Sequence, residues 1–246
     1  SAKGDAGTVK INATETVVID GEDSELVAIV SSQVRPGAEG DGGSVTITTG
    51  SLEVKNGAQI STTTITSAQG NAGGVTITTG SLEVKNGAQI ISGTLAKGNA
   101  GTVEINATET VVIDGGGDLE LGTGIGTKVG EGAEGKGGDI IITAGSLEVK
   151  NVAAINASTS AKGDAGNVGI NATSLEVKNG AQINASTSAK GDAGTVEINA
   201  TETVVIDGGG DLEFGTGVAS QVRTGAEGNG GDIIITTRSL EVKNVA

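Results

Sequence analysis

Apolar and polar residues alternate with a period of two along most of this chain. In one typical stretch, Val75 and Ile77 alternate with threonines, and Leu82 and Val84 alternate with charged residues. The turn dipeptide Asn-Gly follows at 86–87, and a further extended stretch comes after it. A period of two with Gly and Asn corners is typical of short β-strands. The pattern therefore predicts three short strands in each such stretch and no helix.

The same pattern returns along the whole sequence. The decamer SLEVKNGAQI occurs at 51–60, 81–90 and 174–183, with a variant at 146–155. A glycine-rich tetrapeptide precedes each alternating Val-x-Ile or Ile-x-Ile run, and successive runs are 36, 30, 28, 37, 28, 28 and 37 residues apart. This self-similarity indicates a repeat protein with one long unit followed by two short ones. The units start near Thr8, Ser44, Gly74, Thr102, Asp139, Asn167, Thr195 and Asp232.

Three short strands cannot bury an apolar face alone, but stacked copies of one unit can. Each strand then pairs in parallel with its copy in the next unit, about 4.8 Å along the axis. We therefore predict an all-β fold, a right-handed parallel β-helix or three-faced β-solenoid with about 28–37 residues per turn. The handedness follows from the general preference of parallel crossovers. Residues 1–246 are expected to form one continuous solenoid, a segment of a longer repeat protein.

The alternation also predicts columns of interior residues. Two columns hold the Val and Ile of each Val-x-Ile run, and the third holds Leu52 and its equivalents. In the long units we expect Thr16, Thr110 and Thr203 to take the place of that leucine. β-Branched residues suit such columns because their side chains are stiff at χ1 and stack well.

An asparagine column is expected at one corner, with Asp20, Asp114 and Asp207 at this position in the long units. Asn tolerates left-handed backbone, and stacked amides can hydrogen-bond along the axis. We interpret this column as a structural ladder. Its members are Asn56, Asn86, Asn151, Asn179 and Asn244.

The long units depart from the short ones in an apolar segment. When the long units are aligned on the expected columns, they carry valine and isoleucine at the positions where short units have outward Glu and Lys. This alignment predicts apolar pairs on the surface, repeated about every 14 Å along the axis. An insertion of about eight residues follows each pair and could fold back over it. The alternative is a lateral contact strip for a neighbouring fibre or partner. The predicted strip is Val17, Ile19, Val111, Ile113, Val204 and Ile206.

Composition limits the chemistry. The chain has no Cys, His, Met, Trp or Tyr, and its formal net charge is −15. The lack of His and Cys removes most nucleophile–base pairs, so we expect no enzyme activity and no cofactor. The negative charge argues against nucleic acid and anionic membranes as partners. No apolar run approaches the length of a membrane helix, so we expect no membrane insertion.

Two binding alternatives stay open. Acidic insertions could collect Ca²⁺ weakly, although DGGGDLELG at 114–122 lacks the spacing of a calcium-binding nonapeptide. A carbohydrate-binding module is a related possibility, weakened because Phe214 is the only aromatic residue that could stack on sugars. Outward Thr-x-Thr pairs at 46–48 and 76–78 suggest ice binding, but other residues replace them in later units. The acidic insertion residues are Glu22, Asp23, Glu25, Asp118, Glu120, Asp211 and Glu213.

The units at 70–90 and 167–194 resemble repeats of filamentous haemagglutinin-like exoproteins, especially cyanobacterial ones. The resemblance rests on G-N-A-G before V-x-I, on S-L-x-V-x-N-G-A-x-I and on the run N-A-S-T-S, and it covers essentially the whole chain. It implies a right-handed β-helix exported by two-partner secretion and displayed or shed as an adhesin or matrix fibre. The expected location is the extracellular space or cell surface of a Gram-negative bacterium. The expected partners are other copies, end to end or laterally, with host or cell-surface glycans as a second expectation.

Overall fold

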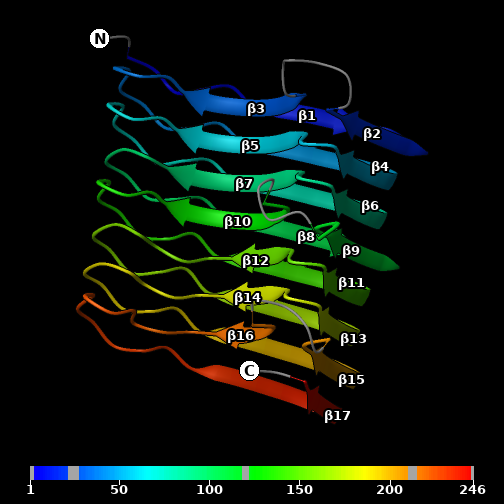
Figure 1. Ribbon diagram of the computed structural model, residues 1–246. Coiled ribbons are helices and arrows are strands. Elements are labelled where there is room, and N and C mark those ends of the chain that lie inside the picture. Colours follow the sequence, from blue (N-terminus) through cyan, green and yellow to red (C-terminus); the bar gives the residue numbers. More distant parts are fainter. Residues whose placement is uncertain (1–2, 22–27, 118–121, 210–214, 245–246) are drawn as a thin grey trace.

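The computed structural model describes residues 3–21, 28–117, 122–209 and 215–244. Its strands form two parallel sheets that coil around a common axis (Figure 1). The larger sheet runs in the order β1 (Val9–Asn12), β4 (Val45–Lys55), β6 (Val75–Lys85), β8 (Val103–Ala107), β11 (Ile140–Lys150), β13 (Val168–Lys178), β15 (Val196–Asp207) and β17 (Ile233–Lys243), with β2 (Thr16–Asp20) and β9 (Thr110–Asp114) continuing β1 and β8. The smaller sheet contains β3 (Ile29–Val34), β5 (Gln59–Thr64), β7 (Gln89–Thr94), β10 (Gly124–Val129), β12 (Ala154–Asn156), β14 (Gln182–Asn184) and β16 (Gly217–Ala219).

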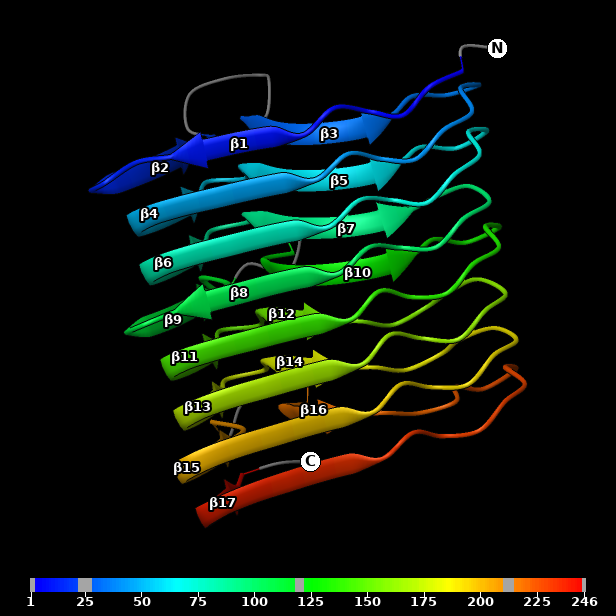
Figure 2. The ribbon, with the colours of Figure 1, turned by 180° about the vertical axis from the view of Figure 1, so that it is seen from behind.

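The coil is right-handed, as the sequence predicts. In Figure 2 the near strands of the larger sheet run to the left, the far strands of the smaller sheet run to the right, and the chain descends from the N-terminus. We call one turn of this coil a rung. Each rung begins its first strand one residue after the expected unit start, for example at Val45 and Val75. The predicted parallel β-helix is therefore confirmed.

Each rung has three sides. In β4 the side chains of Val45, Ile47 and Thr49 are buried at every second position. The next buried side chain, Leu52, comes three positions after Thr49, and Val54 then continues the alternation. A strict alternation would bury position 51, so the shift marks a corner at which the strand bends. Side A is the segment before this corner (45–49 and its equivalents), and side B is the segment after it (51–55 and its equivalents). Side C is the smaller sheet.

The interior contains the stacked aliphatic columns that the alternation predicts. Val45 pairs in register with Val75 and Ile47 with Ile77, and all four side chains are buried. The same two columns continue through the strands of side A to β17, whose residues lie at the end of the stack and are more exposed. Removal of aliphatic surface from water, rung against rung, is the main force holding the coil together.

Side C and side A meet at a vertex built from glycine, here called the glycine vertex (residues 4–7 and their equivalents). A Cβ added to Gly98 would lie 2.0 Å from the carbonyl oxygen of Gly70 in the preceding rung. A Cβ added to Gly166 would lie 1.8 Å from the carbonyl oxygen of Gly138. No side chain fits at these distances, so the motif Gly-x-x-Gly is a steric requirement of rung stacking.

The third interior column differs from the prediction. Leu82 and Leu147 both pair with Val111, and Leu175 pairs with Val204, whereas Thr110 and Thr203 pair with serines that precede these leucines. Each long rung has one extra residue at the corner between sides A and B, visible as a register shift between Ala200 and Thr203. The expectation that Thr16, Thr110 and Thr203 fill the leucine column is therefore wrong. The valines one position later fill it.

Candidate functional site

The same one-residue shift overturns the predicted lateral contact strip. Val111, Ile113 and Val204 have no exposed surface, and Ile206 and Ile19 are also buried. Val17 lies in the terminal rung and packs against the main core. A one-residue slip moves every side chain of a strand to the opposite face. The strip is therefore part of the core and carries no contact surface. The insertions expected to fold back over it carry four large apolar residues, all of which lie outside the described residues: Leu119, Leu121, Leu212 and Phe214.

The surface positions of the long rungs are the valines between the strip residues. Val18 is 52% exposed, and Val112 and Val205 are partly exposed on side B. Each of them occupies the position that holds glutamate in the short rungs: Val18 pairs with Glu53, and Val112 with Glu83. The sequence contained a signal for these outward valines. The long units have Ala-Thr-Glu-Thr where short units have Thr-Gly-Ser, and the one extra residue sets the register of the strand that follows.

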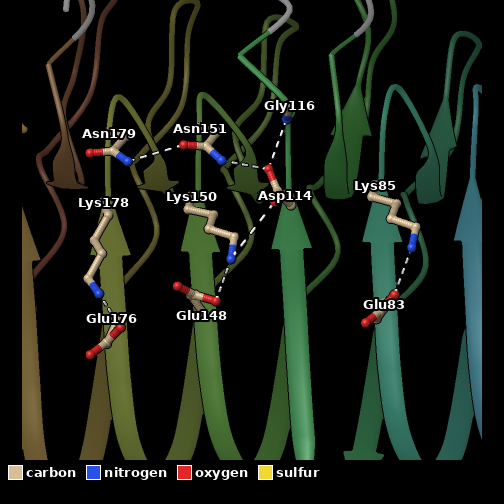
Figure 3. A network of polar contacts seen from close by, with 10 residues as sticks. All are labelled: Glu83, Lys85, Asp114, Gly116, Glu148, Lys150, Asn151, Glu176, Lys178 and Asn179. Atoms are coloured by element: carbon tan, nitrogen blue, oxygen red, sulfur yellow. Dashed lines mark hydrogen bonds and ion pairs between the residues drawn. The ribbon is translucent and has the colours of Figure 1, made fainter.

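The asparagine column is present at the corner between sides B and C. All five asparagines have positive φ, between 51° and 55°. The amide of Asn86 donates to the Oδ1 of Asn56 at 3.2 Å, and Asn179 donates to Asn151 at 3.1 Å (Figure 3). We call this column the asparagine ladder. Every amide in it donates toward the preceding rung.

Aspartates of the long rungs terminate the asparagine ladder. The amide of Asn151 donates to Asp114 Oδ1 at 2.8 Å (Figure 3), and that of Asn244 donates to Asp207 Oδ1 at 3.0 Å. A carboxylate only accepts, so each aspartate ends a run of amides. Two hydrogen bonds to its carboxylate lower the pKa of Asp207: the larger effect comes from the side-chain amide of Asn244, and the smaller from the backbone N–H of Gly209. The contribution of this contact to stability is present at neutral pH and is lost as the pH falls through that lowered pKa.

Asn151→Asp tests the donor role of the ladder. The new carboxylate would face Asp114 and could not donate, so we expect a loss of about 1–2 kcal/mol of unfolding free energy at pH 7. The loss should shrink in acid, because a protonated carboxyl can donate again. Urea unfolding at pH 7 and at pH 4 measures both effects. Asn171→Asp is the matched control, since Asn171 only accepts, from Asn199 at 3.4 Å. Equal losses in the two variants would contradict a donor role for Asn151.

Among the described rungs, the turn that follows the asparagine ladder is strained at Val152. Gly57, Gly87 and Gly180 follow ladder asparagines with φ of 77° to 79°, whereas Val152 holds the same position with φ of 67°. A β-branched residue is disfavoured there. We therefore expect Val152→Gly to raise the unfolding free energy by about 1 kcal/mol despite the added chain entropy. Thermal unfolding followed by circular dichroism provides the measurement, and Val152→Ala should fall between the two. A destabilised glycine variant would show that Val152 is held by packing.

A second side-chain ladder lies at the glycine vertex, and the sequence analysis missed it. The backbone N–H of Asn71 donates to Asp41 Oδ1 at 2.8 Å, and that of Asn99 donates to Asn71 Oδ1 at 2.9 Å. The pattern repeats between Asp164 and Asp192 at 3.1 Å, and this bond lowers the pKa of Asp164. The available signal was the Asp or Asn after the first glycine of the vertex motif. Its short acceptor satisfies a backbone donor in the next rung.

Side B carries rows of ion pairs. Lys85 Nζ lies 2.6 Å from Glu53 Oε1 in the preceding rung and 2.9 Å from Glu83 Oε2 in its own. These contacts raise the pKa of Lys85 and lower that of Glu53. Lys150 similarly lies 2.8 Å from Glu148 and 3.8 Å from Asp114 (Figure 3). The groups are partly exposed, so each pair contributes modestly to stability.

A shallow depression of about 380 Å³ interrupts side B beside Val112. It is lined by Val112, Ser146, Ser174, Glu148 and Glu176, among others. Carboxylates, hydroxyl groups and aliphatic side chains therefore line the same open surface hollow.

The described residues contain no group of three or more metal-ligating side chains. The acidic insertions considered for Ca²⁺, from Glu22 to Glu25 and at Asp118, Glu120, Asp211 and Glu213, lie outside the described residues. Within the described ranges no helix has the length and apolarity needed to cross a membrane.

Comparison with known proteins identifies no relative. No protein-family model matches the chain, and no match was found among curated proteins or solved structures.

Proposed function

We propose that this protein is a non-enzymatic structural or adhesive fibre, built from stacked β-helix rungs and secreted to the cell surface or extracellular matrix. One observation carries the proposal: every described rung pairs in parallel with its neighbours alone, and the long rungs accommodate their extra residue at one corner without leaving the stack. In such a solenoid, the free energy of unfolding is approximately the sum of the stabilities of single rungs and of the interfaces between neighbouring rungs. Further rungs therefore lengthen the rod and leave its cross-section unchanged. Stiffness along one axis is the property that this architecture provides best.

The exterior supports a structural role. Side B presents paired charges, and side A presents threonines, asparagines and glutamates, such as Thr48, Thr78 and Glu104. The ionisable groups with shifted pKa values belong to exposed ion pairs and ladder ends, for example Lys85 and Asp207. Their shifts arise from partners that hold rungs together, which favours a structural function over acid–base catalysis.

The repeat motifs support an extracellular location. Their resemblance to filamentous haemagglutinin-like exoproteins favours export and display on a bacterial surface. Self-association, end to end or laterally, is the corresponding expectation for the partner. A net charge of −15 would help keep such a rod soluble and well separated in water.

Electron microscopy of native cell-surface material, labelled with an antibody raised against this chain, tests the proposal. We expect long labelled filaments with an axial spacing of about 4.8 Å and a modulation at three times that value, about 14 Å. The modulation would come from the long rung that occurs every third turn. Label confined to the cell interior would overturn the proposal, and short isolated rods with closed ends would overturn the fibre.

A further inference from the structure

The long rungs remove a cation from an otherwise regular surface of side B. Short rungs present Glu-x-Lys, as at Glu148 and Lys150, whereas the long rung presents Val112 and Asp114 at the paired positions. Val112 is flanked in register by Glu83 on one side and Glu148 on the other. This long rung therefore places a valine between two glutamates and replaces a lysine by an acid.

The flanking glutamates keep unused acceptor capacity. Glu83 and Glu148 each use Oε2 for the lysine of their own rung, at 2.9 and 2.8 Å. Their Oε1 atoms have no ion pair or hydrogen bond within the described part of the chain. Glu53 differs, because both of its oxygens contact lysines, at 2.6 and 3.4 Å. Two carboxylate oxygens beside Val112 are thus available to a cation from outside.

The hollow beside Val112 suits an alkylammonium group. Its lining includes Val112, Glu148 and Glu176, with the hydroxyls of Ser146 and Ser174 nearby. Glu83 is not part of this lining and borders Val112 from the preceding rung. A lysine side chain has four methylenes that pack on an apolar floor and a terminal ammonium that needs acceptors. The hollow therefore matches lysine in both polarity and charge.

The arrangement recurs along the axis. Val205 lies between Glu176 and Glu241 in the same way, and Val18 lies beside Glu53 in the first rung. These valines are three rungs apart, a separation of about 14 Å. An extended peptide rises about 3.4 Å per residue, so four residues span this distance, and residues i and i+4 point to the same side.

We propose that side B binds a basic polypeptide in extended conformation, with lysines at every fourth residue seated on Val112 and Val205. Each ammonium lies between the glutamates that flank the valine. A foreign basic chain is favoured over a second copy of this protein, because every copy carries the same charge of −15. This inference does not depend on fibre assembly, since the binding surface is complete on one molecule.

The test uses two synthetic peptides of identical composition, with three lysines among serine and glycine. In one the lysines are four residues apart, and in the other three, which places successive lysines on opposite sides. We expect the peptide with four-residue spacing to bind the 246-residue protein about tenfold more tightly in low salt, as measured by calorimetry. The reason is that two of its lysines can be seated at once, whereas the other peptide can seat one. Raising the salt concentration should weaken binding of both.

Paired variants separate the proposed contacts from general charge attraction. Val112→Lys with Val205→Lys should abolish the preference for four-residue spacing. Ile141→Lys with Ile234→Lys adds the same charge at exposed positions of side A and should keep the preference. The proposal is overturned if the two peptides bind wild type equally, if neither binds, or if both double variants lose the preference to the same extent.

Discussion

Val111→Lys is expected to unfold the central rungs. Val111 has no exposed surface and pairs in register with Leu82 and Leu147. A lysine there would bury an ammonium among aliphatic side chains with no acceptor, a change that costs at least about 4 kcal/mol. Urea unfolding followed by circular dichroism should show a large shift of the midpoint. Limited proteolysis should place the opening near residues 102–115.

The neighbouring substitution Val112→Lys is the matched control. The side chain of Val112 faces outward between Glu83 and Glu148. A lysine there would find carboxylates on both sides, so we expect unchanged or slightly higher stability, within about 0.5 kcal/mol. A reversed result, with Val112→Lys destabilising and Val111→Lys tolerated, would restore the lateral strip predicted from the sequence and refute the register.

Gly166→Ala is expected to have the second-largest effect. The new Cβ would lie 1.8 Å from the carbonyl oxygen of Gly138, so two rungs would have to separate at the glycine vertex. Backbone cannot move aside as a flexible side chain does, and rung-to-rung hydrogen bonds would lengthen with it. We expect a loss of about 3 kcal/mol or more in unfolding free energy, measured by urea titration.

Gly169→Ala serves as the control for that experiment. Gly169 lies three residues further along the same rung, and an added Cβ would meet nothing within 4 Å. Alanine should be tolerated or slightly stabilising there, because it restricts the unfolded chain and suits a strand better than glycine. Comparable losses in both variants would show that the glycines matter for chain conformation and not for close approach between rungs.

The sequence predicted the architecture because the signals for it are local and repeated. Alternation identified Val45 and Ile47 as interior residues, and the Asn-Gly dipeptide placed Asn86 at a corner with left-handed backbone. Each signal recurs in rung after rung, so an error in one unit would have been exposed by the others.

The register of the long rungs was not predicted, because it depends on a single residue at a corner. Glu109 and its equivalents are inserted where side A bends into side B, and period-two reasoning has no marker for a bend. Aligning Thr110 with Leu82, when Val111 is its true partner, reversed the outward and inward faces of the segment 110–114. The consequence was a surface strip that is core and a missed row of outward valines. The second side-chain ladder, at the glycine vertex, was missed for a different reason. Its hydrogen bonds join a side chain to backbone, as from the N–H of Asn71 to Asp41, and the apolar pattern does not report such bonds.

The direction of the rung-to-rung hydrogen bonds has a mechanical consequence. In both sheets these bonds join strands that are stacked along the coil axis, such as β4, β6 and β8 (Figure 1). A pulling force applied at the two ends of the rod therefore loads them one after another, and a terminal rung should peel away before its neighbours yield. Each released rung shortens the rod by about 4.8 Å and frees roughly 95–125 Å of extended chain. A fibre of this kind would lengthen in steps under tension and would dissipate energy at each step while the remaining rungs stay intact.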